Sequence, residues 1–385
     1  SIGLKKGDVV AVDIENRPEL LAVVTGCAKI GVCNALINTS QKGRVLVHSY
    51  NLVKPKIAFV GEERREKVEE VRDQLELPDD GFYWVADQDT LEDPGEEPAG
   101  YTNPDTVNHI YMKDPLFYIY TSGTTGLPKA VVFNHGRWWK AFGGFGFTAV
   151  RLNKHDRMYS TLPLYHATGM VICWASAIAG GAGFVVARKF SATRFWDDIR
   201  HYDCTAFGYV GELCRYLYEQ PEKPNDRDNK VHTIVGNGLR PNIWKQFKQR
   251  FGIERVVELY ASSEGNVAFT NVFNFDNTVG FSPVDYAIVR FDQENEEPIR
   301  GKDGFMTPVK KGESGLLLGK ITEETPFDGY TDKEKTEKSI VRDVFEKGDA
   351  YFNTGDMMRD IGYRHAQFVD RLGGTFRWKG ENVST

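Results

Sequence analysis

The residues best suited to chemistry lie in one short segment that follows an apolar run. From Tyr120 to Lys129 the sequence reads Tyr-Thr-Ser-Gly-Thr-Thr-Gly-Leu-Pro-Lys. Its hydroxyl side chains, its glycines, which let backbone N–H groups approach a ligand, and its lysine supply the donors and the positive charge that a polyphosphate needs. We therefore predict that the segment binds phosphate groups through Lys129 and six loop residues: Thr121, Ser122, Gly123, Thr124, Thr125 and Gly126.

This loop differs from the phosphate loop of P-loop kinases and ATPases. That motif ends in Gly-Lys followed by Ser or Thr, and its hydroxyl binds magnesium. Here Pro128 precedes Lys129 and Ala130 follows it, so a P-loop kinase or ATPase is disfavoured. A surface turn without a ligand is the plain alternative, but the apolar strand before the loop and the Pro-Lys ending favour a binding role.

Three more motifs follow the loop in chain order. They are Tyr260-Ala261-Ser262-Ser263-Glu264, Thr354-Gly355-Asp356 and the pair Asp370-Arg371. With the loop, these segments resemble the adenylate-forming superfamily, which includes acyl-CoA synthetases, firefly luciferase and the adenylation domains of peptide synthetases. Within that superfamily, residues 236–241, 260–266 and 376–385 are similar to the branch of fatty acid transport proteins and very-long-chain acyl-CoA synthetases.

The resemblance implies a fold and a division of the chain. The fold class is α/β, namely the N-terminal domain of an adenylate-forming enzyme with two layered α/β subdomains and a β-rich subdomain built as a distorted barrel. This large domain is expected at residues 1–370, with the β-rich part at about 271–370. Residues 371–385 are expected to form the hinge and the start of the small C-terminal domain. The rest of that domain lies outside the chain, so we expect the chain to be incomplete for full turnover.

The resemblance also implies a reaction. A carboxylate attacks the α-phosphorus of ATP, which gives an acyl-adenylate and pyrophosphate, and the thiol of coenzyme A then displaces AMP; Mg²⁺ is the expected metal. We expect a ligase that joins long- or very-long-chain fatty acids to coenzyme A. The alternatives are a CoA ligase for an aromatic, bile or carnitine-like acid, and a lipid-uptake or lipid-binding protein with a vestigial adenylation site.

The same resemblance implies roles for single side chains. Lys129 is expected to neutralise the triphosphate, Glu264 to hold Mg²⁺, Asp356 to accept both ribose hydroxyls, Arg371 to reach the ribose or phosphates and His166 to position the acyl carboxylate. The expected catalytic set is Lys129, Glu264, His166 and Arg371. Further nucleotide contacts, around an adenine stacked on Tyr260, are expected from Gly236, Asn237, Gly238, Ala261, Ser262 and Ser263. Besides His166, the acyl site is expected to contain Val210, Gly211 and Glu212.

Each role has a plain structural alternative. Glu264 could cap a helix, Asp356 could only stabilise the turn in which it lies, and Arg371 could form a surface ion pair. His166 is near apolar residues and could be a core histidine whose hydrogen bonds are all made within the protein. One departure from the branch lies at the hinge, where Gly374 replaces an expected aspartate; a second glycine there is predicted to loosen the hinge.

The elements that must position these residues alternate along the chain. Apolar runs predict strands at 9–14, 57–60, 117–120, 184–186, 206–209, 234–236 and 256–260. Helices are predicted at Pro18–Lys29, opened by Asn16, and at Ala192–His201, capped by Ser191. This alternation predicts α/β layers with mostly parallel sheets. After Asn271, short strands and Gly/Pro/Asp turns predict a β-rich region.

Composition narrows the class of protein. The chain has 385 residues, 41% of them hydrophobic and 26% charged, with a net charge of -6. These values disfavour a disordered protein, a coiled coil and a protein that binds nucleic acid through a broad basic surface. Its five cysteines contain no C-x-x-C pair, which indicates reduced thiols of a cytosolic protein. The histidines have no metal-ligand spacing, so we predict no structural zinc.

One uncharged segment, Ala167–Ala187, is long enough by count to span a bilayer. Gly180, Gly181 and Gly183 interrupt it, which favours a buried helix followed by a strand. We therefore expect a cytoplasmic location, either free or peripheral on the cytoplasmic face of a membrane.

Overall fold

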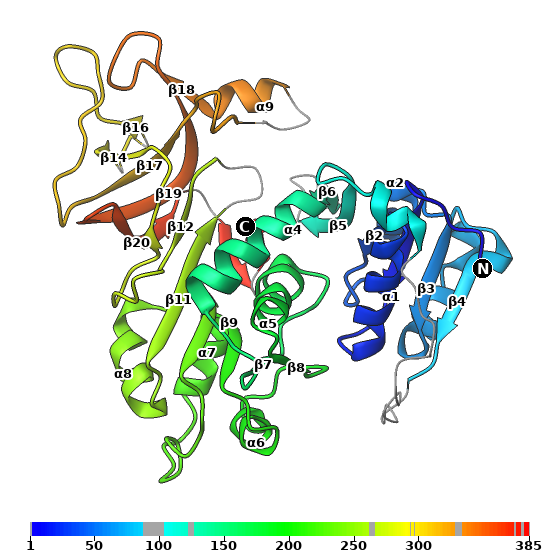
Figure 1. The fold of residues 1–385 in the computed structure, drawn as a ribbon. Helices are drawn as coiled ribbons and strands as arrows, with labels where there is room; N and C mark the ends of the chain where they lie inside the picture. Colours follow the sequence, from blue (N-terminus) through cyan, green and yellow to red (C-terminus); the bar gives the residue numbers. More distant parts are fainter. Residues whose placement is uncertain are drawn as a thin grey trace. The chain divides into compact units, whose positions relative to one another are not determined.

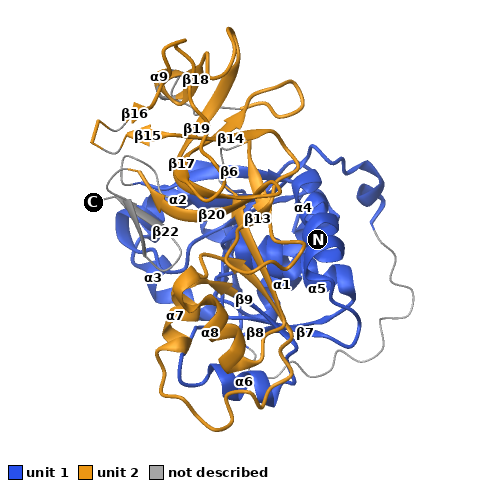
Figure 2. Ribbon diagram, turned by 90° about the vertical axis from the view of Figure 1, so that its left-hand side faces the viewer, with its two compact units in different colours: residues 1–208 blue, residues 209–385 orange. Residues whose placement is uncertain are grey.

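The computed structural model describes residues 2–87, 104–121, 127–261, 266–292, 294–295, 297–327, 333–372, 375–378 and 381–384. The chain forms two compact units, residues 1–208 and residues 209–385 (Figures 1 and 2). Their boundary falls inside strand β9 (Ala206–Val210). The seven strands expected from apolar runs are all present, each within one or two residues of its expected bounds.

The first unit contains a mostly parallel sheet with the strand order β4-β3-β1-β2-β5-β6. Its strands are β1 (Val9–Asp13), β2 (Cys33–Leu36), β3 (Ile57–Gly61), β4 (Phe82–Val85), β5 (Pro115–Thr121) and β6 (Lys129–Asn134). All neighbours pair in parallel except β5 and β6, which are antiparallel.

Alternate residues of this sheet enter two different cores. Val10 and Val12 pack in one core with α1 (Pro18–Lys29), whereas Ala11 packs in another with α2 (Gly43–Val53). Because helices cover both faces, the central strands are mostly apolar instead of alternating with polar residues; the buried polar exceptions are Asn34 in β2 and Asp13 at the end of β1. The predicted α/β layering is therefore confirmed for this part of the chain.

Helix α1 begins at Pro18 as predicted, but the prediction that Asn16 caps it is wrong. The residue before the helix is Arg17, and no side chain caps that end. Asn16 is buried, and its side chain donates to the carbonyl of Leu162 (2.8 Å) and accepts from the N–H of Leu164 (2.8 Å). A buried amide must find partners, and here the partners come from a distant segment.

A second group of strands in the first unit is also parallel. Strand β7 (Arg157–Ser160) pairs with β8 (Gly183–Val186) and with β9. Helix α6 (Phe195–His201) starts three residues later than predicted, and Ser191 contributes its carbonyl to the N–H of Phe195 (3.0 Å), not a side-chain cap. The uncharged segment forms a π-helix, η6 (Thr168–Cys173), then α5 (Trp174–Gly180) and β8. Among the described residues, no helix has both the length and the hydropathy needed to cross a membrane.

Strand β6 leads directly into a longer helix. Asn134 caps α4 (His135–Ala141) by accepting the N–H of Arg137 (2.8 Å). Helix α4 continues without a break as a π-helix, η5 (Phe142–Val150). Arg151, with φ 59°, then ends it in the left-handed region. Shorter segments of the first unit are α3 (Arg65–Glu69), η1 (Glu62–Arg64), η2 (Arg72–Gln74), η3 (Asp79–Gly81) and η4 (Asp105–His109).

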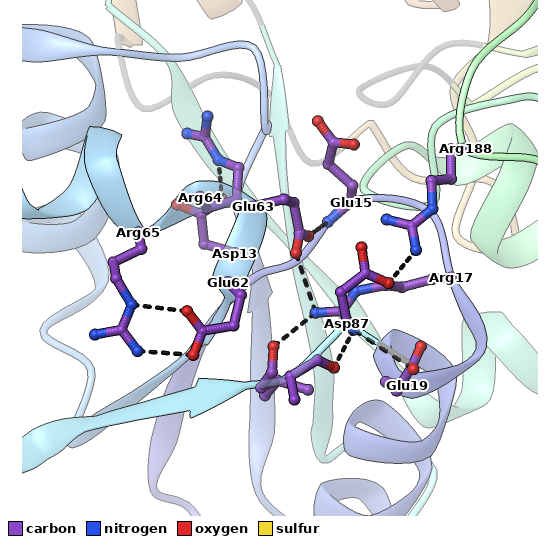
Figure 3. A network of polar contacts seen from close by, with 12 residues as sticks. Asp13, Glu15, Arg17, Glu19, Glu62, Glu63, Arg64, Arg65, Asp87 and Arg188 are labelled. Carbon is purple, nitrogen blue, oxygen red and sulfur yellow. Dashed lines mark hydrogen bonds and ion pairs between the residues drawn. The ribbon is translucent and has the colours of Figure 1, made fainter. Parts of the chain in front are cut away.

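Charged side chains fill the carboxyl ends of β1, β3 and β4 (Figure 3). The chain runs from β1 to β2 on one side and then to β3 on the other, so β1 and β3 flank the topological switch point. There the Arg64 Nε lies 2.8 Å from the Asp13 carboxylate, and both residues are buried. Arg17, also buried, pairs with Glu63 (3.1 Å) and donates to the Ala86 carbonyl (2.6 Å).

The second unit starts with parallel pairing and continues into an antiparallel sheet. Strands β10 (Thr233–Asn237) and β11 (Arg255–Ala261) are parallel and are joined by α8 (Pro241–Phe251); α7 (Gly211–Tyr218) follows β9. From β11 the strand order is β12-β13-β20-β19-β17-β14. Their bounds are β12 (Ala268–Thr270), β13 (Gly280–Phe281), β14 (Tyr286–Val289), β17 (Ser314–Lys320), β19 (Ala350–Gly362) and β20 (His365–Arg371).

The β-rich region is confirmed, but the expected barrel is wrong, because the described strands form an open sheet. The sheet ends at β14, which pairs with β17 alone among the named strands. Closing a barrel requires tilted, staggered strands around the whole ring, and β12, β13 and β14 have only three, two and four residues. The remaining elements are β15 (Phe291–Asp292), β16 (Glu297–Pro298), β18 (Ile340–Arg342), β21 (Thr375–Trp378), β22 (Glu381–Ser384) and α9 (Lys333–Lys338).

Candidate active site

A cavity of about 710 Å³ lies within the second unit. It brings together the carboxyl ends of β9, β10 and β11 with β19 and β20. This is the edge at which open parallel sheets bind ligands. Nine of the predicted residues line it: Val210, Gly211, Glu212, Asn237, Gly238, Tyr260, Ala261, Asp356 and Arg371. Residues predicted for the nucleotide and for the acyl chain therefore share one cavity.

Asp356 is buried and is held by contacts to two of these residues. It is 4% exposed, and its Oδ2 accepts the Tyr260 hydroxyl at 2.5 Å. Its other oxygen lies 3.8 Å from the Nε of Arg371. The pairing register of β19 with β20 places Arg371 directly opposite Asp356. Strand pairing and two side chains thus fix a negative charge at the cavity wall.

Tyr260 is a hydrogen-bond donor here as well as an aromatic wall. Burial raises the pKa of Tyr260, and the neighbouring Asp356 carboxylate adds to this rise, so the hydroxyl keeps its proton. Its ring packs edge-on against Phe269 (6.0 Å between centroids) and lies 6.5 Å from Phe368. Only 7% of the residue is exposed.

The turn Thr354-Gly355-Asp356 lies inside β19, where the register with β17 shifts, and contacts to its own strand and to neighbouring segments hold it. The Thr354 hydroxyl donates to the carbonyl of Leu317 (2.8 Å) and accepts the N–H of Asp356 (3.1 Å). Gly355 has φ +69°, which a residue with a side chain rarely adopts. Its carbonyl accepts the N–H of Leu372 (2.7 Å), so the turn also secures the end of β20.

Glu258 is a cavity residue that was not predicted. It is 3% exposed on β11, and its carboxylate accepts the N–H of Gly238, the N–H of Leu239 (3.4 Å) and the hydroxyl of Tyr209. These bonds hold the loop between β10 and α8, which forms one wall of the cavity. The signal was present in the sequence, because Glu258 is the one charged residue in the run Val256–Tyr260.

The glycines predicted near the adenine allow neighbouring backbone segments to lie close together. A Cβ on Gly236 would collide with the carbonyl oxygen of Tyr209, so β10 needs glycine at this point. Gly236 itself does not line the cavity. Gly238 has φ +87°, which turns the chain from β10 toward α8. These glycines shape the wall that Glu258 secures.

Glu212, predicted for the acyl site, lies in an ion-pair cluster. Its carboxylate contacts Arg215 (2.7 Å) and Arg240 (3.1 Å). Arg240 also lines the cavity, and 58% of its side chain is exposed. One edge of the cavity is therefore charged, whereas Val210 supplies an apolar wall.

The phosphate loop lies in the first unit, between two antiparallel strands. Thr121 ends β5, Lys129 begins β6, and the two residues pair directly. In P-loop proteins the strand leads through the loop into a helix, so the hairpin supports the distinction made from the sequence. Five predicted loop residues lie outside the described residues: Ser122, Gly123, Thr124, Thr125 and Gly126.

His166 also belongs to the first unit, in the turn before η6. Its N–H donates to the carbonyl of Pro163 (3.1 Å), and its carbonyl accepts the N–H of Met170 (3.0 Å). The ring lies 4.6 Å from that of Tyr165. The segment is anchored by Asn16, which bonds to the backbone just before this turn.

The predicted magnesium ligand, Glu264, lies outside the described residues, as do Ser262 and Ser263. Within the described residues, no group of three or more His, Cys, Asp or Glu side chains could hold a metal ion. The five cysteines are buried free thiols, as the sequence indicated. Metal binding at Glu264 therefore stays a prediction.

Solved structures define the class of fold. The anthranilate CoA ligase AuaEII in complex with anthranoyl-AMP matches with a TM-score of 0.71 and 18% identity, covering 100% of this chain and 72% of that chain. ATP-bound MatB from Rhodopseudomonas palustris matches with the same TM-score, identity and coverage. The fold is that of the N-terminal domain of an adenylate-forming enzyme.

Sequence comparison then gives the family. The AMP-binding enzyme family matches residues 1–310, and the chain belongs to this family. A medium/long-chain fatty acid–CoA ligase of Mycobacterium tuberculosis, FadD6, is 44% identical over 383 residues. Long-chain fatty acid transport protein 2 of Rattus norvegicus is 40% identical over 398 aligned positions. Each alignment covers 100% of this chain and 64% of the relative.

Proposed function

We propose that this chain is the ATP-binding and acid-binding part of a fatty acid–CoA ligase acting on long- or very-long-chain acids. The observation that carries the proposal is the Asp356 carboxylate, held by Tyr260 and opposite Arg371 at the wall of a cavity that also contains Val210 and Gly211. The names of the relatives, a fatty acid–CoA ligase and a fatty acid transport protein, support the choice of a fatty acid.

The proposed nucleotide contacts follow from the chemistry of these groups. A carboxylate has about four lone-pair sites, so Asp356 can accept two ribose hydroxyls in addition to the Tyr260 hydroxyl. Hydrogen bonds to a charged group contribute about 1.5–3 kcal/mol each. Arg371 lies beside the same carboxylate and would contact the ribose or a phosphate. Adenine would lie against Tyr260 and the loop that contains Asn237 and Gly238.

Charge control governs the proposed first step, in which two anions must meet. Lys129 and the loop after Thr121 would neutralise the triphosphate as charge moves to pyrophosphate. Mg²⁺, held by Glu264, would supply further neutralisation when bound. His166 would orient the acyl carboxylate without carrying a proton. Coenzyme A would then displace AMP at the acyl carbon.

We also propose a cytoplasmic location, free or at the cytoplasmic face of a membrane. The support is the state of the five cysteines, which are buried free thiols, as is usual in a reducing compartment.

Nucleotide binding is the direct test for this chain. Calorimetry with ATP and AMP should show binding that Asp356→Ala weakens by at least tenfold, since more than one charge-assisted hydrogen bond is lost. Asp360→Ala is the matched control, because this carboxylate is on the same strand but outside the cavity and accepts the N–H of Gly362 (2.7 Å). Equal nucleotide affinity in wild type and Asp356→Ala would contradict the ribose assignment.

A second measurement separates the ligase from a lipid-binding protein with a vestigial site. Fatty acids of increasing chain length, benzoate and a bile acid are titrated with and without ATP. A ligase should bind both long-chain acids and ATP, because its reaction requires the two ligands together in one site. Binding of fatty acid together with no detectable nucleotide binding would favour the vestigial site.

A further inference from the structure

Helix α4 and the π-helix η5 form one continuous helix, His135–Val150 (Figure 1). It carries a row of aromatic side chains, two of which are exposed. Trp139 is 55% exposed and Phe147 is 60% exposed. Phe142 lies between them, stacked on Trp139 (4.9 Å between centroids) and edge-on to Phe147 (5.1 Å). These three residues, which we call the aromatic row, form one contiguous apolar surface.

The opposite side of this helix is firmly packed. Ala141, Ala149 and Val150 are buried. Gly146 allows a close approach to α5, because a Cβ at this position would collide with the side chain of Ala179. Trp138 lies between the two sides: it packs edge-on against Trp174 of α5 (5.8 Å) and stacks on Phe142 of the aromatic row (5.8 Å). The exposure of the aromatic row is therefore a fixed feature of a packed helix and not the result of a loose segment.

The helix that carries the aromatic row and the residues that flank it in sequence have charges of one sign. No Asp or Glu occurs between Asp114 and Asp156. In the same stretch there are five cations: Lys129, Arg137, Lys140, Arg151 and Lys154. The last four are exposed and lie on or directly after the helix, in a chain whose net charge is -6. Exposed aromatic residues thus have a basic border within an acidic protein.

We propose that the aromatic row and its basic border bind the surface of an anionic lipid bilayer. Trp and Phe side chains are suited to the boundary between headgroups and acyl chains. Lys and Arg near an anionic leaflet each contribute about 1 kcal/mol, that is, about fivefold in affinity. The helix would lie in the plane of the interface, with the rings of the aromatic row inserted and the cations among the headgroups.

A second copy of the chain fits this face less well. In a twofold dimer the same patch meets itself, so Arg137, Lys140 and Arg151 would meet the same cations of the partner. Such like-charge contact is unfavourable at an interface. An anionic bilayer instead matches both the apolar surface and the charge. The proposal does not depend on ligase activity, so binding is measured without ATP or fatty acid.

The test is co-sedimentation with vesicles of phosphatidylcholine containing 30% phosphatidylglycerol, compared with pure phosphatidylcholine. We expect binding to the anionic vesicles that weakens as salt is raised. Trp139→Ala with Phe147→Ala should reduce it about tenfold or more, because two inserted side chains are lost. Lys140→Gln with Lys154→Gln should reduce it about 25-fold, at about fivefold per cation.

Matched controls come from the second unit. Tyr363→Ala removes an aromatic residue that is 84% exposed, and Lys302→Gln with Lys310→Gln removes two exposed cations; neither change should alter vesicle binding. Equal binding to both vesicle types, or wild-type binding by the Trp139→Ala/Phe147→Ala variant, would overturn the proposal. So would a dimer, detected by light scattering, that this variant converts to monomer.

Discussion

Replacing Tyr260 with Phe removes a single oxygen from the centre of the cavity wall. That hydroxyl donates to Asp356 at 2.5 Å, between residues that are 7% and 4% exposed. Because burial raises the pKa of Tyr260, the tyrosine is a neutral donor at any pH at which the protein is folded. The substitution therefore removes one donor from a buried carboxylate and leaves the ring in place.

The magnitude follows from the partner's charge. A hydrogen bond to a charged group contributes about 1.5–3 kcal/mol, and an unsatisfied buried oxygen costs a similar amount. A domain of 150–250 residues loses about 2–4 °C in Tm for each kcal/mol. Tyr260→Phe should thus lower the Tm of the second unit by about 3–12 °C.

The assay is urea unfolding of wild type, Tyr260→Phe, Asp356→Asn and the double variant. If the bond is direct, the double variant should be more stable than the sum of the single effects predicts, by about 1–2 kcal/mol. Calorimetric scans assign the transition to one unit. A coupling energy near zero, or a Tyr260→Phe variant within about 0.5 kcal/mol of wild type, would refute this reasoning.

Three further outcomes follow from the contacts described above. Glu258→Gln should lower the free energy of unfolding by about 1.5–3 kcal/mol, since a charged acceptor for the N–H of Gly238 is lost, and it should also weaken ATP binding. Urea unfolding measures the first effect and calorimetry the second, and unchanged values would contradict the role given to this carboxylate. Burial lowers the pKa of His135 below 6.5, so the unfolded chain takes up the proton first, and stability should fall as pH drops below about 6.5; His135→Asn should reduce this slope between pH 5 and 8. Burial raises the pKa of Cys27 and Cys33 to about 12, so both thiols should react slowly with a disulfide reagent at pH 8 until urea unfolds the chain, and rapid native reaction would contradict their burial.

Much of the fold could be predicted because its strands are buried on both faces. Runs such as Val9–Asp13 and Arg255–Ala261 are mostly apolar and bounded by turns, so their positions can be predicted from the sequence alone. Helix α1 was also predicted at its observed bounds, Pro18–Lys29. The predicted cap by Asn16 was wrong because the partners of this side chain, Leu162 and Leu164, are remote in sequence and could not be identified from it.

The candidate site was predictable where the family motifs reach it. The sequence pointed to Tyr260, Asp356 and Arg371 separately, and the register of β19 with β20 brings Asp356 and Arg371 opposite each other. Glu258 was missed because no motif contains it, and its function depends on a loop about 20 residues earlier in the chain. The open β-rich sheet was missed because strand closure depends on lengths and tilt, which the turn pattern does not encode.

The side chains of the ion pairs at the carboxyl ends of β1 and β3 fill the topological switch point of the first sheet. Where other doubly wound sheets keep a crevice for a ligand, the guanidinium groups of Arg17 and Arg64 occupy that place (Figure 3). These buried ion pairs therefore support the sheet that also contains the hairpin β5–β6. For protein engineering, replacing Arg64 with a shorter residue and Asp13 with a neutral one would together create space for a small ligand at the carboxyl ends of β1 and β3.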